Sequence, residues 1–278
     1  MRCVDRMVTG CARLLPLLLL VLVSGCGAAA YEQRLQETAK YFAYVEKLDA
    51  NLAAPFKAGS IDELRVPLQF REIKAPPLIK NEKGEVVPPD VDPRQPNYLL
   101  MEFPKDTLIA TWEAPFDVVT KDGVEKRKGY IYALSNASMS DPDQAADFTK
   151  NVLNKLAEAL RVPTPDYSKF DAEEYPRAKM YTVPNKFRVY RFGADQAVID
   201  GLPYTVELYL NEPGGDVQLL LVVVLPVGID SKEKLAERIP MMLESLKANK
   251  KKQPIKKSGP AAATGGVAPE APKPNTGF

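Results

Sequence analysis

Acidic side chains at short spacing are the groups in this sequence whose positions could support chemistry. Glu113 and Asp117 are four residues apart in a predicted strand, so they share one face and could form the carboxylate pair used by glycosidases. Asp141, Asp143 and Asp147 could offer oxygen ligands to Ca²⁺, although the glycine and the distal glutamate of an EF-hand are missing. We interpret them as a helix cap with charges that suit the helix dipole, and we predict no metal or other cofactor.

The chain contains no histidine, and this excludes several familiar kinds of active site. Histidine is the usual general base near neutral pH and the commonest metal ligand, so Ser-His-Asp catalysis, Cys-His catalysis and histidine-based zinc sites are ruled out. Of the three cysteines, Cys3 and Cys11 lie in a predicted export signal. Once the export signal is removed, Cys26 is the sole remaining cysteine, so the mature chain cannot form an internal disulfide. We predict a non-enzymatic protein, with a carboxylate-dependent hydrolase as the catalytic alternative.

Aromatic residues are the side chains best suited to binding. Trp112, Tyr130, Tyr132, Tyr190 and Phe192 all lie in predicted strands. Strand alternation places Tyr130 and Tyr132 on one face, and Tyr190 and Phe192 on another. An exposed aromatic face would bind a protein partner or a sugar polymer, and these five residues are our candidates for that contact. The alternative is that the rings pack in the core.

Residues 1–25 have the three parts of an export signal: a basic start, an apolar run and small residues at the end. The apolar run, Leu14 to Val23, is half the length that a membrane-spanning helix needs. It leads into Val23-Ser24-Gly25-Cys26, which resembles the lipobox of bacterial lipoproteins. The resemblance implies cleavage before Cys26, lipid on its thiol and a membrane anchor outside the cytoplasm. Gly27 replaces the aspartate that retains such proteins at the inner membrane, which favours the outer membrane where one is present.

The charge of the chain is balanced, with 37 basic and 36 acidic residues, so no overall field attracts nucleic acid and none is expected as a partner. The last segment, 250–278, begins with lysines and continues with Ala, Pro and Gly. It cannot bury enough apolar surface to order itself, so we predict a disordered tail. The alternative is a basic tether for anionic lipid or cell-wall polymer.

Residues 26–59 are predicted to form a lipidated tether and an N-terminal helix from Tyr31 to about Ala54. Leu35, Phe42, Val45, Leu48 and Leu52 recur there at helical spacing. The helix either packs on its own domain or serves as a partner helix or coiled-coil stalk near the membrane.

The globular domain is predicted to span 60–249 and to be α+β, with helices packed on a largely antiparallel sheet. Arg65–Ile73 is a predicted strand, and 75–97 is a proline-rich loop with a small hairpin near Gly84 that could bind a partner. The remainder gives a βββα pattern twice, as three strands and a helix in each half. The first half comprises strands 98–103, 108–120 and 124–134 and a helix from Pro142 to about Arg161. A polar linker, 163–176, follows. The second half comprises strands 186–192, 204–210 and 217–225 and a helix after Asp230, which Pro240 should kink. The strand 217–225 is almost entirely apolar, so it should be central and covered on both faces.

This arrangement is similar to PsbP-like α/β sandwiches. The likeness rests on the Arg65-Val66-Pro67-Leu68-Gln69-Phe70 strand and on the closing Leu243-Glu244-Ser245-Leu246, and it covers about 60–249. It implies a non-enzymatic accessory role and carries over no site residues. We therefore expect a lipid-anchored extracytoplasmic accessory protein that binds an unidentified protein of the cell envelope. A tyrosine-lined module for a small ligand or a polysaccharide is the alternative.

Overall fold

The structure is a computed structural model of the whole chain. It describes residues 29–80, 84–87, 89, 91–121, 123–176, 181, 183–214 and 216–250. The predicted export signal, the lipid site at Cys26 and all of the predicted tail except Lys250 lie outside these residues.

The domain is built on a seven-stranded sheet in which every neighbouring pair is antiparallel. Its strands, in spatial order, are β3 (Arg71–Ile73), β6 (Leu108–Thr120), β7 (Gly123–Ser135), β11 (Val217–Pro226), β10 (Leu202–Gly214), β9 (Asn185–Ile199) and β8 (Asp171–Tyr175). The nearly all-apolar strand β11 therefore lies at the centre, as its sequence predicts. The predicted α+β class is confirmed.

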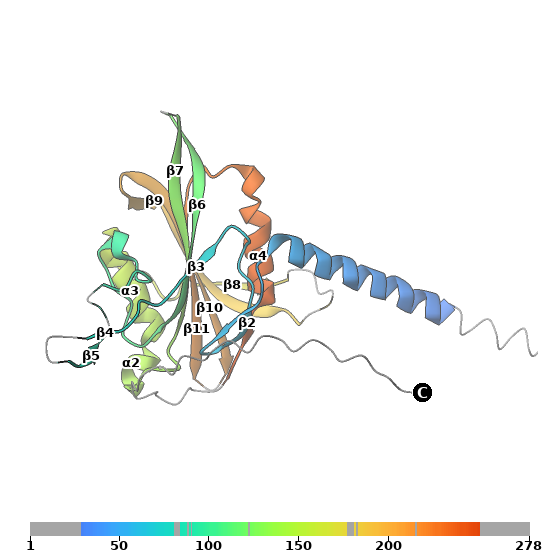
Figure 1. Cartoon of the computed structure of the whole chain (residues 1–278), viewed down its shortest axis with the longest axis horizontal. Helices are drawn as coiled ribbons and strands as arrows, with labels where there is room; N and C mark the ends of the chain where they lie inside the picture. The colour runs from blue at the N-terminus through green and yellow to red at the C-terminus, as the bar shows by residue number, and fades with distance from the viewer. Residues whose placement is uncertain are drawn as a thin grey trace, which may run out of the picture.

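Helices cover both faces of this sheet. Figure 1, which shows the sheet edge-on, places α2 (Pro142–Ala146) and α3 (Phe148–Leu160) on one side and α4 (Leu235–Ser245) on the other. Alternate residues of β11 serve the two layers: Leu221 and its like-facing neighbours pack in the cluster with α4, and Leu220 and its neighbours pack in the cluster with α3. Two-sided burial explains why this strand lacks the polar alternation of a half-exposed one.

The N-terminal helix leaves the body of the protein. Residues 29–51 are helical, close to the predicted range, and Figure 1 shows this unlabelled blue helix pointing away from the sheet. Contact with the domain is made by its second half: Tyr41 and Tyr44 meet Tyr181, Leu48 is half-buried, and Leu52, just beyond the helix, is buried. No helix among the described residues is both long and apolar enough to span a bilayer.

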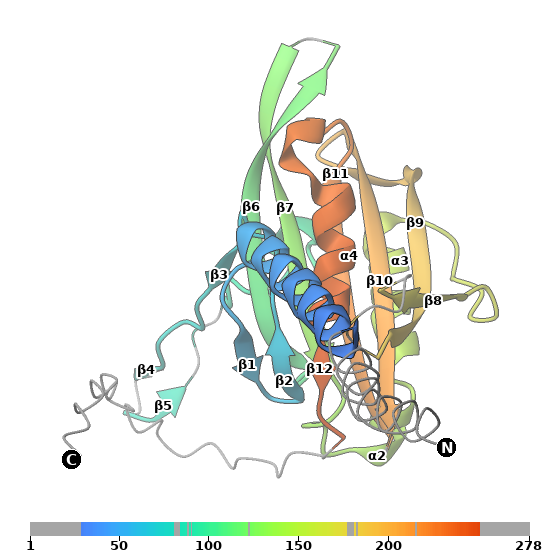
Figure 2. The same ribbon diagram turned by 90° about the vertical axis from the view of Figure 1, so that its right-hand side faces the viewer.

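Small elements complete the fold. β1 (Phe56–Ala58), β2 (Ile61–Leu64) and β12 (Lys247–Ala248) form a three-stranded sheet near α4 (Figure 2). The proline-rich loop carries a two-stranded hairpin of β4 (Ile79–Lys80) and β5 (Val86–Val87), as predicted, and this hairpin stands away from the body. Two 3₁₀ turns, η1 (Asn97–Leu99) and η2 (Ser231–Glu233), precede β6 and α4 respectively.

Several predicted boundaries are wrong. The predicted strand 98–103 is the turn η1 followed by loop, and β3 takes the place beside β6. Of the predicted strand Arg65–Ile73, only Arg71–Ile73 forms a strand, β3, because the chain turns at Pro67, whose carbonyl accepts the N–H of Phe70. The predicted linker 163–176 contains β8, a strand whose exposed polar residues hide it from pattern analysis.

Because β11 is packed from both sides, truncating one of its side chains should be costly. We expect Leu220→Ala, which opens a cavity under α3, to lower the free energy of unfolding by about 2–5 kcal/mol. Val119→Ala, at an exposed site on β6, should change it by less than about 0.5 kcal/mol. Denaturant titration of the purified mature protein measures both, and equal losses would contradict the layered core.

Candidate partner-binding surface

Three of the five aromatic binding candidates are buried, so the prediction of an exposed aromatic sheet face is wrong for them. Trp112, Tyr132 and Phe192 are 3%, 1% and 2% exposed. Trp112 lies in the α4 layer, with its ring edge-on to Phe56 at a centroid distance of 5.0 Å. Tyr132 and Phe192 lie in the α3 layer. The physical reason is that both sheet faces are covered, which leaves no free face at these positions.

The other two candidates, Tyr130 and Tyr190, are half-buried by neighbouring loops. Tyr98, from the turn η1, stacks on Tyr130 with centroids 4.5 Å apart and an interplanar angle of 14°. The Tyr132 hydroxyl donates a hydrogen bond to the Tyr98 hydroxyl at 3.2 Å. Burial raises the pKa of Tyr130 to about 12 and the pKa values of Tyr98 and Tyr132 further above their ordinary range. These hydroxyls remain protonated at neutral pH, as expected for core side chains.

The acidic groups serve structural roles. Asp141 caps α2, as predicted, because its Oδ1 accepts the N–H groups of Asp143 and Gln144 at 3.0 and 3.2 Å. Glu113 pairs with Lys128 at 2.8 Å, and Asp117 lies opposite Lys126 in the β6–β7 register. Within the described ranges, no group of three acidic, cysteine or histidine side chains could hold a metal ion.

A charged cluster that the sequence does not predict lies on the β8–β9–β10 part of the sheet. Arg191 reaches Glu173 at 2.6 Å through Nη2, Glu207 at 3.3 Å through Nε and Asp171 at 3.6 Å through Nη1. The cluster links three strands by ion pairs, which is a structural role for these charges. Recognising β8 as a strand would have placed Glu173 beside β9, which carries Arg191.

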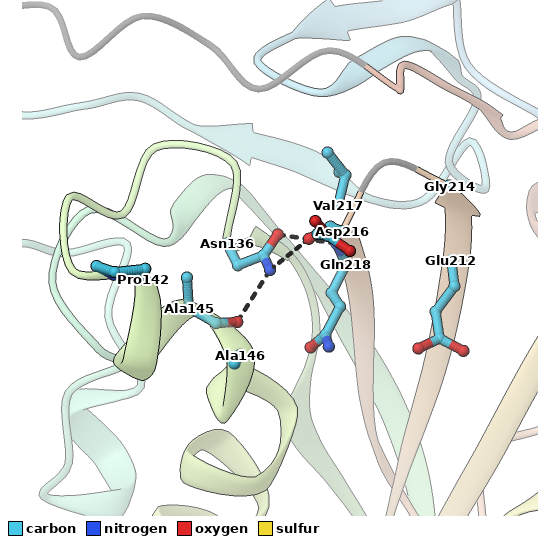
Figure 3. A pocket seen from close by; sticks show the side chains of 9 residues that line it. All are labelled: Asn136, Pro142, Ala145, Ala146, Glu212, Gly214, Asp216, Val217 and Gln218. Atoms are coloured by element: carbon cyan, nitrogen blue, oxygen red, sulfur yellow. Dashed lines mark hydrogen bonds between the residues drawn. The ribbon is translucent and has the colours of Figure 1, made fainter.

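One cavity, of about 530 Å³, lies between α2 and the β10–β11 hairpin (Figure 3). The Asn136 amide joins its walls: it donates to the carbonyls of Ala145 and Asp216 at 3.0 Å each, and its Oδ1 accepts the N–H of Gln218 at 2.8 Å. The carboxylates in the lining are Glu212 and Asp216. The polar atoms of the Asn136 amide already bond to backbone groups. We therefore assign Asn136 a structural role, in which it joins α2 to the β10–β11 hairpin.

Exposed apolar side chains gather on the proline-rich loop. Four large ones project there, each about half or more exposed: Leu78, Ile79, Val86 and Val91; a fifth, Leu100, lies just beyond the loop and is 96% exposed. They lie on or beside the β4–β5 hairpin, which stands away from the sheet in Figure 1, or at the end of η1. Exposed apolar side chains on a loop make this segment a candidate interaction surface.

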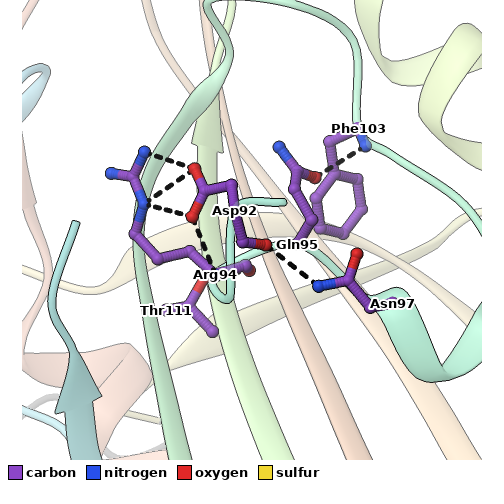
Figure 4. Close-up of polar contacts among 6 residues, drawn as sticks. All are labelled: Asp92, Arg94, Gln95, Asn97, Phe103 and Thr111. Carbon is purple, nitrogen blue, oxygen red and sulfur yellow. Dashed lines mark hydrogen bonds and ion pairs between the residues drawn. The ribbon is translucent and has the colours of Figure 1, made fainter. Parts of the chain in front are cut away.

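The base of this loop is attached to the sheet through the Arg94 backbone, beside an Asp92–Arg94 ion pair that lies within the loop itself (Figure 4). The Arg94 guanidinium donates to both Asp92 oxygens, with Nη2 to Oδ2 at 2.6 Å and Nε to Oδ1 at 3.0 Å. The Arg94 carbonyl accepts the hydroxyl of Thr111, a buried residue of β6, at 2.8 Å. Partial burial raises the pKa of Asp92, but the hydrogen bonds and charge of Arg94 outweigh it and hold the pKa below its usual value.

Further contacts fix the C-terminal part of the loop. Gln95 accepts the Phe103 N–H at 2.9 Å, and the Asn97 amide donates to the Asp92 carbonyl at 3.0 Å. Leu100 has a left-handed backbone with φ of 52° and is 96% exposed. A left-handed backbone is less favourable for leucine than for glycine or asparagine. Because Leu100 is exposed, no burial of its side chain offsets this cost.

A scan against family models and a search of curated proteins found no match. Among solved structures, the chain is similar to a crystal structure from Bacteroides thetaiotaomicron at 12% identity and a TM-score of 0.29. The alignment covers 70% of this chain and 48% of that one. A likeness at this score carries no argument about fold or function.

The pinned base should be separable from the core. Arg94→Ala removes the guanidinium ion pair and hydrogen bonds to Asp92 but keeps the backbone bonds of both residues, so hydrogen exchange in residues 92–103 should accelerate at neutral pH while the core strands keep their protection. Lys74→Ala, which removes an exposed ion pair with Glu72, should leave the same peptides unchanged. Uniform acceleration across the domain would contradict a local role.

The same contact should respond to acid. The pKa of Asp92 is lower in the folded protein than the value of about 4 expected in the unfolded chain, so the ion pair adds stability above that pH. This contribution is lost as the pH falls through the folded-state pKa. We expect protection factors in residues 92–103 to drop as the pH falls below about 4, and to be lower and less pH-dependent in Asp92→Asn. An equal drop in both proteins would assign the response to another group.

Proposed function

We propose that this chain is a lipid-anchored extracytoplasmic accessory protein, without catalytic activity, that binds a protein partner in the cell envelope through its proline-rich loop. The observation that carries the proposal is that Leu78, Ile79, Val86 and Val91 are exposed on a loop whose base is bonded to β6, with the exposed Leu100 just beyond it. Exposure of these apolar side chains to water is unfavourable, so a partner that buries them gains hydrophobic free energy. Because the base of the loop is already bonded to the sheet, binding does not have to order that part of the chain.

The anchor follows from the sequence. The lipobox resemblance ends at Cys26, and the described helix begins three residues later. A helix of residues 29–51 is about 35 Å long, so it can carry the domain at a distance from the bilayer. In this proposal the lipid determines the compartment and the loop provides the binding surface.

A tyrosine-lined binding module remains the second candidate, because a cleft of about 630 Å³ lies between the N-terminal helix and α4. Tyr44 and Tyr181 line it with ring centroids 5.2 Å apart, and Lys47 and Glu244 add charge. A sugar ring or a small amphipathic ligand suits such walls. Thermal shifts across a ligand panel test this reading; a shift lost in Tyr181→Ala supports it, and silence across the panel removes it.

The partner reading is tested by cross-linking the tagged full-length protein in cells, followed by mass spectrometry. Leu100→Asp combined with Val91→Asp should reduce capture of a specific partner about tenfold or more, as expected when residues at the centre of an interface are lost. Val183→Asp, a substitution at a site that is 90% exposed and off the loop, is the matched control and should retain capture. Equal capture by both variants would exclude the loop.

The anchor is tested separately by detergent-phase partition. The natural protein should enter the detergent-rich phase, and Cys26→Ser should stay in the aqueous phase because it has lost the thiol that carries lipid. Aqueous partition of the natural protein would contradict lipidation.

A further inference from the structure

The N-terminal helix carries an apolar stripe that the domain does not cover. Tyr31, Leu35 and Phe42 are half or more exposed, whereas Val45, nearer the body, is half-buried. Thr38 lies between them, and its hydroxyl donates to the Arg34 carbonyl, which leaves its methyl group free for apolar packing. The helix contacts the body through a different side, where Tyr41 and Tyr44 meet Tyr181.

The spacing along this stripe is that of a coiled coil. Steps of four, three, four and three residues separate the five positions Tyr31, Leu35, Thr38, Phe42 and Val45. These are d and a positions of successive heptads, which form a seam with another helix. The stripe is rotated by roughly a quarter of a turn from the Tyr41 side, so a second helix can lie along it without displacing the domain.

The charges of the helix favour a protein partner over the bilayer. Residues 29–51 hold three basic and four acidic side chains. Helices that lie in a membrane surface are rich in Lys and Arg on their polar face, and this one is not. In a parallel pair, the positions flanking the seam bring Arg34 opposite Ala39 and Tyr41 opposite Glu46, so no like charges face each other.

We propose that the stripe is covered by the same stripe of a second copy, in a parallel, in-register helix pair. This inference rests on the proposed lipid anchor. Anchors at Cys26 hold the N-terminal ends of both helices at one membrane surface, which imposes the parallel direction. A seam of about two heptads is too short to persist in dilute solution. Confinement to a membrane raises the effective concentration and makes so short a seam sufficient.

The experiment uses single cysteines in the full-length protein, expressed in cells and treated in membranes with a short bis-maleimide. The mature chain has no free thiol when Cys26 is lipidated, so each introduced cysteine is the sole target. Tyr31→Cys and Phe42→Cys lie on the seam; Gln33→Cys and Gln36→Cys are exposed controls on the same helix. All four sites are exposed, so none of the substitutions threatens the fold.

We expect Tyr31→Cys and Phe42→Cys each to give covalent dimers several times more readily than the two controls. An antiparallel pair cannot give both products, because the two positions lie about 16 Å apart along the helix. Adding Cys26→Ser, together with Cys3→Ser and Cys11→Ser so that an uncleaved signal adds no thiol, should abolish the difference between seam and control positions. Coupling at all four positions, coupling of only one seam position, or coupling at none of them overturns the parallel pair. Detergent partition reports on the anchor independently, so an anchored protein that does not couple refutes the pair alone.

Discussion

Two-sided burial of the central strand β11 is the constraint on which the rest of the structure depends. A strand with apolar side chains on both faces can be stable only if each face receives its own layer, and the chain supplies α3 for one and α4 for the other. The β-meander β9–β10–β11 and the β6–β7 hairpin then add strands outward from the centre. Each sheet face is closed over its middle, and polar residues collect on the outer strands, as in the cluster around Arg191.

Closure of both faces changes where binding can occur. Aromatic side chains on inner strands become part of the core, and the turn η1 seals part of the remaining aromatic surface by stacking Tyr98 on Tyr130. Exposed apolar groups are concentrated instead on segments that leave the body: the proline-rich loop and the N-terminal helix. The division gives the protein a stable domain that presents two separate surfaces. We propose one for an envelope partner and the other for a second copy.

The loop and its support illustrate how an irregular segment can be held without regular structure. Prolines remove backbone donors, so a proline-rich loop cannot be stabilised by a long ladder of hydrogen bonds. The bond from the Thr111 hydroxyl to the Arg94 carbonyl attaches the base to β6, and the Asp92–Arg94 pair links two residues of the loop to each other. The tip is then free to present apolar side chains while the entry and exit of the loop stay in place.

The sequence by itself determined the α+β class, the long strands β6, β7, β9, β10 and β11, and the central place of β11, because these follow from local periodicity and continuous apolar runs. It also determined that histidine chemistry is absent, which composition alone decides. Tertiary structure decided which aromatic residues are buried, since alternation identifies the face of a strand but not what covers it. It also decided the fate of two short segments. Residues 98–103 look like a strand locally, yet β3 occupies that edge, and the polar segment 171–175 becomes β8 only because β9 offers it an edge. Pairing with a neighbour, which no local pattern records, is the physical reason for both outcomes.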